Sequence, residues 1–212
     1  MNPYSDSAPP ICLGIFTAVF IWTGIRPASH LIWFLYALPA LAALAAILFT
    51  YHRFPLTRIS YFLILFYCVI QLISGHFMCA DIPVLRHVQN ALDLPVENST
   101  RFTYLVNGFV PAVVLREILI RKQVVNGMGW LFSVVVSFTL SIHIMINLLK
   151  WWAAQYLDFA VIHFFQQEDQ LRFILPDSAM VLCGAIIALL ILEKAHDNEI
   201  HAISSLRRNR HE

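Results

Sequence analysis

Residues 31–51 read LIWFLYALPALAALAAILFTY, an apolar run that reaches the roughly 20 residues a helix needs to cross a bilayer. The rest of the chain has the same character. Of its 212 residues 59% are hydrophobic and only 13% are charged, and the mean hydropathy is +0.69. A soluble domain averages about 25% charged residues. The sequence therefore predicts an all-α, polytopic integral membrane protein.

Similar apolar runs along the chain predict a bundle of about six transmembrane helices in a single membrane domain. The predicted spans are 11–26, 31–51, 60–77, 102–120, 129–151 and 177–195. The first run is short for a full span, which fits a tilted or partly interfacial helix. No Lys or Arg precedes it, so we expect a retained helix rather than a cleaved signal peptide.

The basic residues predict the orientation, because cytoplasmic loops of membrane proteins carry an excess of Lys and Arg. Six spans place both termini on one side of the membrane. That side holds Arg53, Arg58, Arg116, Arg121, Lys122, Lys194, Arg207, Arg208 and Arg210. The other side holds Arg26, Arg86, Arg101, Lys150 and Arg172. We therefore expect a bacterial inner-membrane protein with both termini in the cytoplasm.

Polar residues gather in the outer halves of the predicted spans. His143, Asn147 and Lys150 share one face of the fifth span, and Tyr104 and Asn107 share one face of the fourth. Polar side chains in a membrane helix face the bundle interior or water. The sequence predicts an outer polar pocket, with an ion pair between lysine and aspartate, formed by His76, Arg101, Tyr104, Asn107, His143, Asn147, Lys150 and Asp177.

A structural interpretation of the same residues stays open. His143 and Asn147 would join helices by hydrogen bonds. Lys150 would extend to the membrane interface beside two tryptophans. Asp177 would cap the N-terminus of the sixth helix, directly after a proline.

We expect no cofactor and no metal. A membrane cytochrome b needs two histidines at matched depth, and His143 is the only one well inside a predicted span. No HxxxH spacing predicts a metal site. The cysteines, which lack a CxxC spacing and are expected as buried small hydrophobes, are Cys12, Cys68, Cys79 and Cys183. No catalytic motif such as GxSxG or HExxH occurs, and the net charge of +1 gives no basic surface for nucleic acid.

The fourth span contains adjacent charges in the stretch NGFVPAVVLREILIRK at 107–122. Arg116 and Glu117 lie about 6 to 9 Å from the helix end at a rise of 1.5 Å per residue. An arginine side chain reaches the interface from that depth. Glu117 also has Arg121 as its i+4 neighbour. We expect these three residues to anchor the cytoplasmic end of the helix.

Several motifs follow one another in a recognisable order. They are FPLT at 54–57, SGHFMCADIP at 74–83, NGFVPAVVLREILIR at 107–121, the WW pair at 151–152, DSAMVLCGAIIAL at 177–189 and HD at 196–197. In this order the chain resembles the YjdF-type bacterial inner-membrane proteins, a family whose biochemical role is not established. A looser similarity to VanZ-like membrane proteins suggests envelope or glycopeptide-resistance biology by analogy.

The resemblance also marks departures from the family pattern. Where family members have an Asp-Arg pair and a His before the GFxPA motif, this chain has Thr100, Arg101 and Tyr104. Where they have glutamates on the fifth helix, it has Asn147 and Lys150. If the family's acidic residues perform catalysis or bind a cation, the resemblance implies that this chain has lost that activity.

Two functions follow as hypotheses. The first is a non-catalytic structural or accessory subunit that packs against partner helices, either other membrane subunits or further copies of itself, within the lipid. The alternative is an enzyme or binding protein that acts on a lipid-linked or envelope substrate through the outer polar pocket. The long outer connections 78–101 and 152–176 support the alternative, because long loops often carry function.

Overall fold

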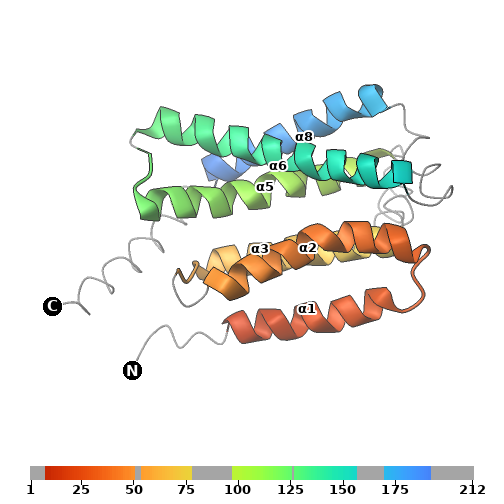
Figure 1. The fold of residues 1–212 in the computed structure, drawn as a ribbon. Helices are drawn as coiled ribbons and strands as arrows, with labels where there is room; N and C mark the ends of the chain where they lie inside the picture. The colour runs from red at the N-terminus through yellow and green to blue at the C-terminus, as the bar shows by residue number, and fades with distance from the viewer. Residues whose placement is uncertain (1–7, 51–53, 78–96, 126, 157–169, 192–212) are drawn as a thin grey trace. The chain divides into compact units, whose positions relative to one another are not determined.

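The computed structural model describes residues 8–50, 54–77, 97–125, 127–156 and 170–191. Within these ranges all regular secondary structure is helical (Figure 1). The helices are α1 (Ala8–Gly24), α2 (His30–Thr50), α3 (Arg58–His76), α5 (Glu97–Lys122), α6 (Met128–Tyr156) and α8 (Gln170–Ile191). Each corresponds to one predicted span, so the predicted all-α architecture is confirmed.

Four helices contain segments long and apolar enough to cross a membrane. These segments are His30–Phe49, Arg58–His76, Arg101–Lys122 and Met128–Trp152. Two shorter apolar helical segments, Pro9–Gly24 and Pro176–Ile191, accompany them. The short first helix was expected from the length of its apolar run. The two long outer connections, 78–101 and 152–176, fall mostly outside the described residues.

The chain divides into two compact units, each described by itself. The first contains α1, α2, α3 and the start of α5 as far as Thr103. The second contains α5 from Tyr104 onward, most of α6, and α8. The single membrane domain expected from the sequence stays a prediction.

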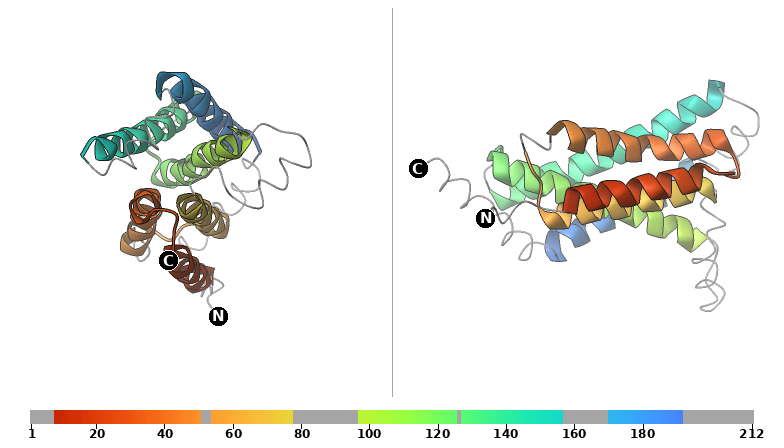
Figure 2. Two further views of the ribbon diagram at one scale, coloured as in Figure 1. Left: turned by 90° about the vertical axis from the view of Figure 1, so that its right-hand side faces the viewer. Right: turned by 90° about the horizontal axis from the view of Figure 1, so that it is seen from below.

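In the first unit α3 packs against both α1 and α2 (Figure 2). The helix begins at a side-chain cap, in which Thr57 Oγ1 accepts a hydrogen bond from the backbone N–H of Ser60 at 3.2 Å. Cys68 and Leu72 are buried, and the thiol of Cys68 lies 3.8 Å from the carbonyl oxygen of Ala40 on α2. The α3 helix therefore forms the core of the first unit.

In the second unit α5 and α8 cross at two glycines. A Cβ atom on Gly108 would collide with the backbone carbonyl of Val181, and one on Gly184 would collide with the carbonyl of Leu105. The two backbones approach this closely only because neither glycine carries a side chain. This close contact sets the position of α5 relative to α8 within the second unit.

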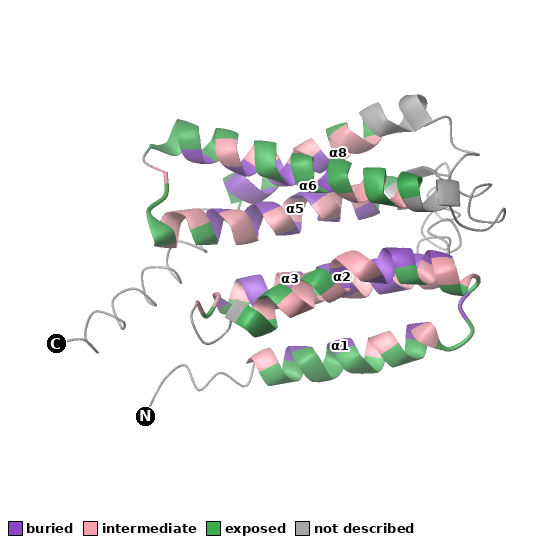
Figure 3. Ribbon diagram, viewed as in Figure 1, coloured by how far each residue is buried: buried purple, intermediate pink, exposed green. Residues whose placement is uncertain are grey.

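The face that α6 buries repeats every fourth residue: Leu131, Val135, Thr139 and His143 are all buried. Other faces of α6 and much of α1 are exposed and strongly apolar (Figure 3). Phe138 is one such exposed side chain. Large exposed hydrophobic surfaces on helices of this length are typical of contact with lipid.

Candidate functional site

A cluster of polar and aromatic side chains joins α5 and α6 in the second unit. The rings of Tyr104 and His143 meet edge to face, with their centroids 5.4 Å apart. Asn147 Nδ2 donates a hydrogen bond to Nε2 of His143 at 2.9 Å. The same Asn147 nitrogen lies 3.4 Å from the other ring nitrogen, Nδ1. The structure thus brings three residues of the predicted pocket together.

Helical spacing explains this arrangement. His143 and Asn147 are four residues apart on α6, so they lie on one face. His143 continues the buried face of α6 toward its C-terminal end, which turns its ring toward the α5 residue Tyr104. His143 is buried and Asn147 is half-buried, as expected for polar groups that avoid lipid in a membrane helix.

Asn107 lies one turn after Tyr104 on α5. Its side-chain oxygen Oδ1 is buried and has no hydrogen-bond partner among the described residues. Leaving a buried acceptor without a donor costs about 1 to 3 kcal/mol. The position therefore offers a carbonyl oxygen to any group that can supply a proton donor.

Three further residues of the predicted pocket lie on α5, α6 and α8. Arg101 is exposed on the first turns of α5, while Lys150 and Asp177 are half-buried. The interpretation of Asp177 as a helix cap is wrong, because α8 begins at Gln170 and runs through Pro176. A proline inside a helix removes one backbone hydrogen bond and strains the preceding turn, which need not end the helix.

His76 has its partners in the first unit. Its Nδ1 donates to the carbonyl oxygen of Thr23 at 2.8 Å, since a carbonyl can only accept. The ring stacks on Trp22 with centroids 5.5 Å apart. The backbone carbonyl of His76 accepts a hydrogen bond from the N–H of Ala28 at 3.3 Å. His76 thus holds the end of α3 against the end of α1.

The charged residues near the end of α5 are more buried than a surface anchor would be. Glu117 is fully buried and Arg116 is 3% exposed. The predicted i+4 pair is present, with Arg121 Nη1 at 2.8 Å from Glu117 Oε1. The side chains of both partners are buried. The pair is therefore present but buried, and the role of these three residues as helix-end anchors stays a prediction.

Among the described residues no three His, Cys, Asp or Glu side chains lie together as metal ligands would. Cys12 and Cys68 are buried, as expected, but Cys183 is exposed on α8. Cys79 lies outside the described residues. The expectation of no cofactor stays a prediction.

Long apolar helices, polar residues shielded between them and a wide apolar exterior together define a polytopic helical membrane protein. Residues 8–198 match a family described as predicted membrane protein (DUF2238), and the chain belongs to this family. The chain is 29% identical over 184 residues to the inner membrane protein YjdF of Escherichia coli (strain K12), a match that covers 87% of this chain and 88% of that protein. No solved structure matches the chain significantly. The resemblance to YjdF-type proteins is confirmed.

Proposed function

We propose that the protein is a non-catalytic accessory subunit of the membrane, which packs against a partner transmembrane helix through α6. One observation carries the proposal: α6 has a row of small residues, spaced by four and all exposed. We name this row the small-residue stripe, and it consists of Gly129, Ser133, Ser137 and Ser141.

The small-residue stripe has the properties of a helix-packing face. A Cβ atom on Gly129 would meet nothing within 4 Å, so the surface there is open. The hydroxyls of Ser133 and Ser141 donate to the carbonyls of Gly129 and Ser137 at 3.0 and 2.8 Å. Because these donors are satisfied within the helix, a partner can cover them without leaving a buried unpaired group. Small residues at this spacing let two helix backbones approach closely in a bilayer.

Two further features support a role in packing. The buried face of α6 also repeats every four residues. The helix therefore carries a buried row that packs within the protein and, in the small-residue stripe, an exposed row that is open to a partner. The chain itself uses close contact at small residues where Gly108 and Gly184 meet. A second interface built on the same principle requires no new chemistry.

The test compares the mass of the wild-type chain with the masses of variants. Each is tagged, full-length and purified from native membranes in mild detergent. We expect wild type to be larger than one 24.3 kDa chain. The double variant Ser133→Leu/Ser141→Leu should shift to the single-chain mass, because leucines hold the partner backbone away. Ser133→Ala/Ser141→Ala should retain the complex. Ile142→Phe serves as the control. It adds bulk to an exposed residue that lies at the same depth as Ser141 but about 100° away from it around the helix.

A wild-type chain that purifies as a monodisperse monomer contradicts the accessory-subunit proposal. So does an unchanged complex in the double leucine variant.

We also propose that the protein lies in the inner membrane with both termini in the cytoplasm, and the distribution of Lys and Arg supports this orientation.

A second candidate function is binding of a lipid-linked or envelope substrate at the cluster of Tyr104, His143 and Asn147. The buried, unpartnered Oδ1 of Asn107 favours it. Asn107→Leu distinguishes the two roles. If the residue binds a substrate, the variant loses a deletion-complementing phenotype at unchanged protein level. If the residue only packs, the variant complements fully and its melting temperature is unchanged or higher, since a buried unpaired acceptor has been removed.

A further inference from the structure

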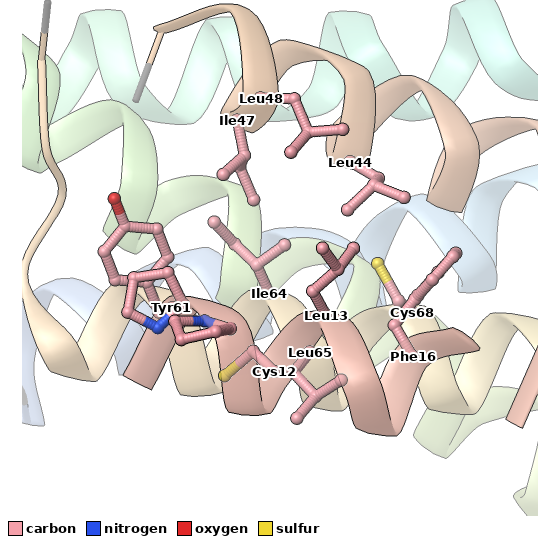
Figure 4. A pocket seen from close by; sticks show the side chains of 12 residues that line it. Cys12, Leu13, Phe16, Leu44, Ile47, Leu48, Tyr61, Ile64, Leu65 and Cys68 are labelled. Atoms are coloured by element: carbon pink, nitrogen blue, oxygen red, sulfur yellow. The ribbon is translucent and has the colours of Figure 1, made fainter. Parts of the chain in front are cut away.

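The first unit contains an apolar groove between α1, α2 and α3, with a volume of about 250 Å³ (Figure 4). Its walls are formed chiefly by Leu13, Phe16, Leu44, Leu48, Ile64 and Leu65. The polar side-chain groups on its lining are the hydroxyl of Tyr61 and the thiols of two cysteines. The groove is therefore suited to hydrocarbon rather than to a polar ligand.

The groove lies at one end of the first unit. It uses the first half of α1, the last turns of α2 and the first half of α3 (Figure 4). These segments come together because the three consecutive helices run antiparallel (Figure 1). On α3 the lining runs from Tyr61 to Cys68, which is about 10 Å along the helix. One leaflet of the hydrocarbon core is about 15 Å deep. The lining on α3 thus extends over about two thirds of the depth of one leaflet.

Tyr61 lines the groove near the start of α3, and Arg58 lies one turn earlier on the same helix. The hydroxyl of Tyr61 accepts a hydrogen bond from the backbone N–H of Leu56 at 3.2 Å, just before α3 begins. Arg58, the first residue of α3, is exposed. Between Asp6 and Asp81 the sequence has no acidic residue, so the charge of this part of the chain is positive. An exposed arginine beside an apolar groove complements an anionic head group carrying acyl chains.

We propose that the groove binds one acyl chain of an anionic phospholipid, whose phosphate lies at Arg58. Hydrocarbon fills any lipid-facing groove, but this groove should retain one lipid molecule and prefer a negatively charged head group. The site is independent of the small-residue stripe on α6, and either proposal can fail without the other.

Native mass spectrometry of the delipidated full chain tests the site. The probes are phosphatidylglycerol and phosphatidylethanolamine with identical acyl chains. We expect one phosphatidylglycerol to be retained at an about fivefold lower lipid concentration than phosphatidylethanolamine, the effect of roughly one basic residue near an anionic group. Arg58→Gln should remove this preference while leaving retention of phosphatidylethanolamine unchanged.

Leu48→Trp fills the groove from an exposed position and should reduce retention of both lipids. Leu48 is 54% exposed, so the substitution disturbs the core little. Leu190→Trp on α8 makes the same change at a residue that is 70% exposed and does not line the groove. Melting temperatures confirm that each variant is folded. The proposal is overturned if wild type retains the two lipids equally, retains neither, or if Leu48→Trp and Leu190→Trp behave alike.

Discussion

Glu117 shows how strongly burial changes the role of a single residue. In an exposed helix an i+4 pair with Arg121 would contribute only about 0.2 to 0.5 kcal/mol. In this protein the carboxylate is fully buried and pairs with a guanidinium that is itself almost fully buried. Removing one partner of a buried pair leaves the other charge uncompensated in a medium that solvates it poorly. The residue is therefore required for stability far more than its spacing alone suggests.

We predict that Glu117→Gln lowers the stability of the protein by about 3 to 5 kcal/mol, the usual cost of breaking a buried ion pair. Thermal unfolding of the detergent-solubilised chain measures the effect. The double variant Glu117→Gln/Arg121→Gln should be more stable than the single variant, because it removes the orphaned charge as well. A single variant that melts like wild type would show that the carboxylate is not needed.

At the scale of the element, hydropathy predicts which segments are helices because the bilayer imposes their length. It does not predict the start of α8. The proline at 176 suggests that the helix begins after it, at 177, whereas the helix in fact begins at Gln170 and contains the proline. Nor does it predict the crossing of α5 and α8. The glycines at 108 and 184 are visible in the sequence, but nothing in it says that they face each other.

The same limit applies to α6. The spacing of Gly129, Ser133, Ser137 and Ser141 can be read from the sequence, but only the structure shows that this row is exposed while the row containing His143 is buried. The fold brings together two of the motifs on which the resemblance to the family rests. NGFVPA contributes Gly108 and DSAMVLCGAIIAL contributes Gly184, so these motifs meet at one crossing.

We predict that Gly108→Ala and Gly184→Ala each destabilise the protein. The added methyl group would overlap a backbone carbonyl of the opposite helix, and a backbone cannot move aside as a flexible side chain can. The cost should exceed about 1 to 3 kcal/mol, the usual range for overpacking. Gly14→Ala is the matched control, because a Cβ there meets nothing within 4 Å and alanine favours a helix. Melting temperatures that fall equally in all three variants would contradict the close crossing.

At the scale of the whole molecule, the polar residues predicted to share one pocket are explained only in part. His143 and Asn147 follow from helical spacing, and Tyr104 joins them through the packing of α5 and α6. His76 instead fastens α3 to α1 within the first unit. Sequence spacing predicts neighbours on one helix, whereas the partner on another helix depends on rotations that a hydropathy pattern does not specify.

The orientation of the chain is a prediction about the whole molecule. With both termini in the cytoplasm, green fluorescent protein fused after residue 212 should fluoresce, and alkaline phosphatase fused there should be inactive. Fusions within the connection between α3 and α5, at residue 88, should give the opposite result, because this connection follows an odd number of spans.

Much of the cytoplasmic excess of basic residues lies at Arg207, Arg208 and Arg210. Replacing these three by glutamine should therefore weaken the bias, measured as a rise in phosphatase activity at the C-terminus. Active phosphatase at the C-terminus of the unaltered chain would reverse the predicted orientation and place Arg58 at the outer leaflet.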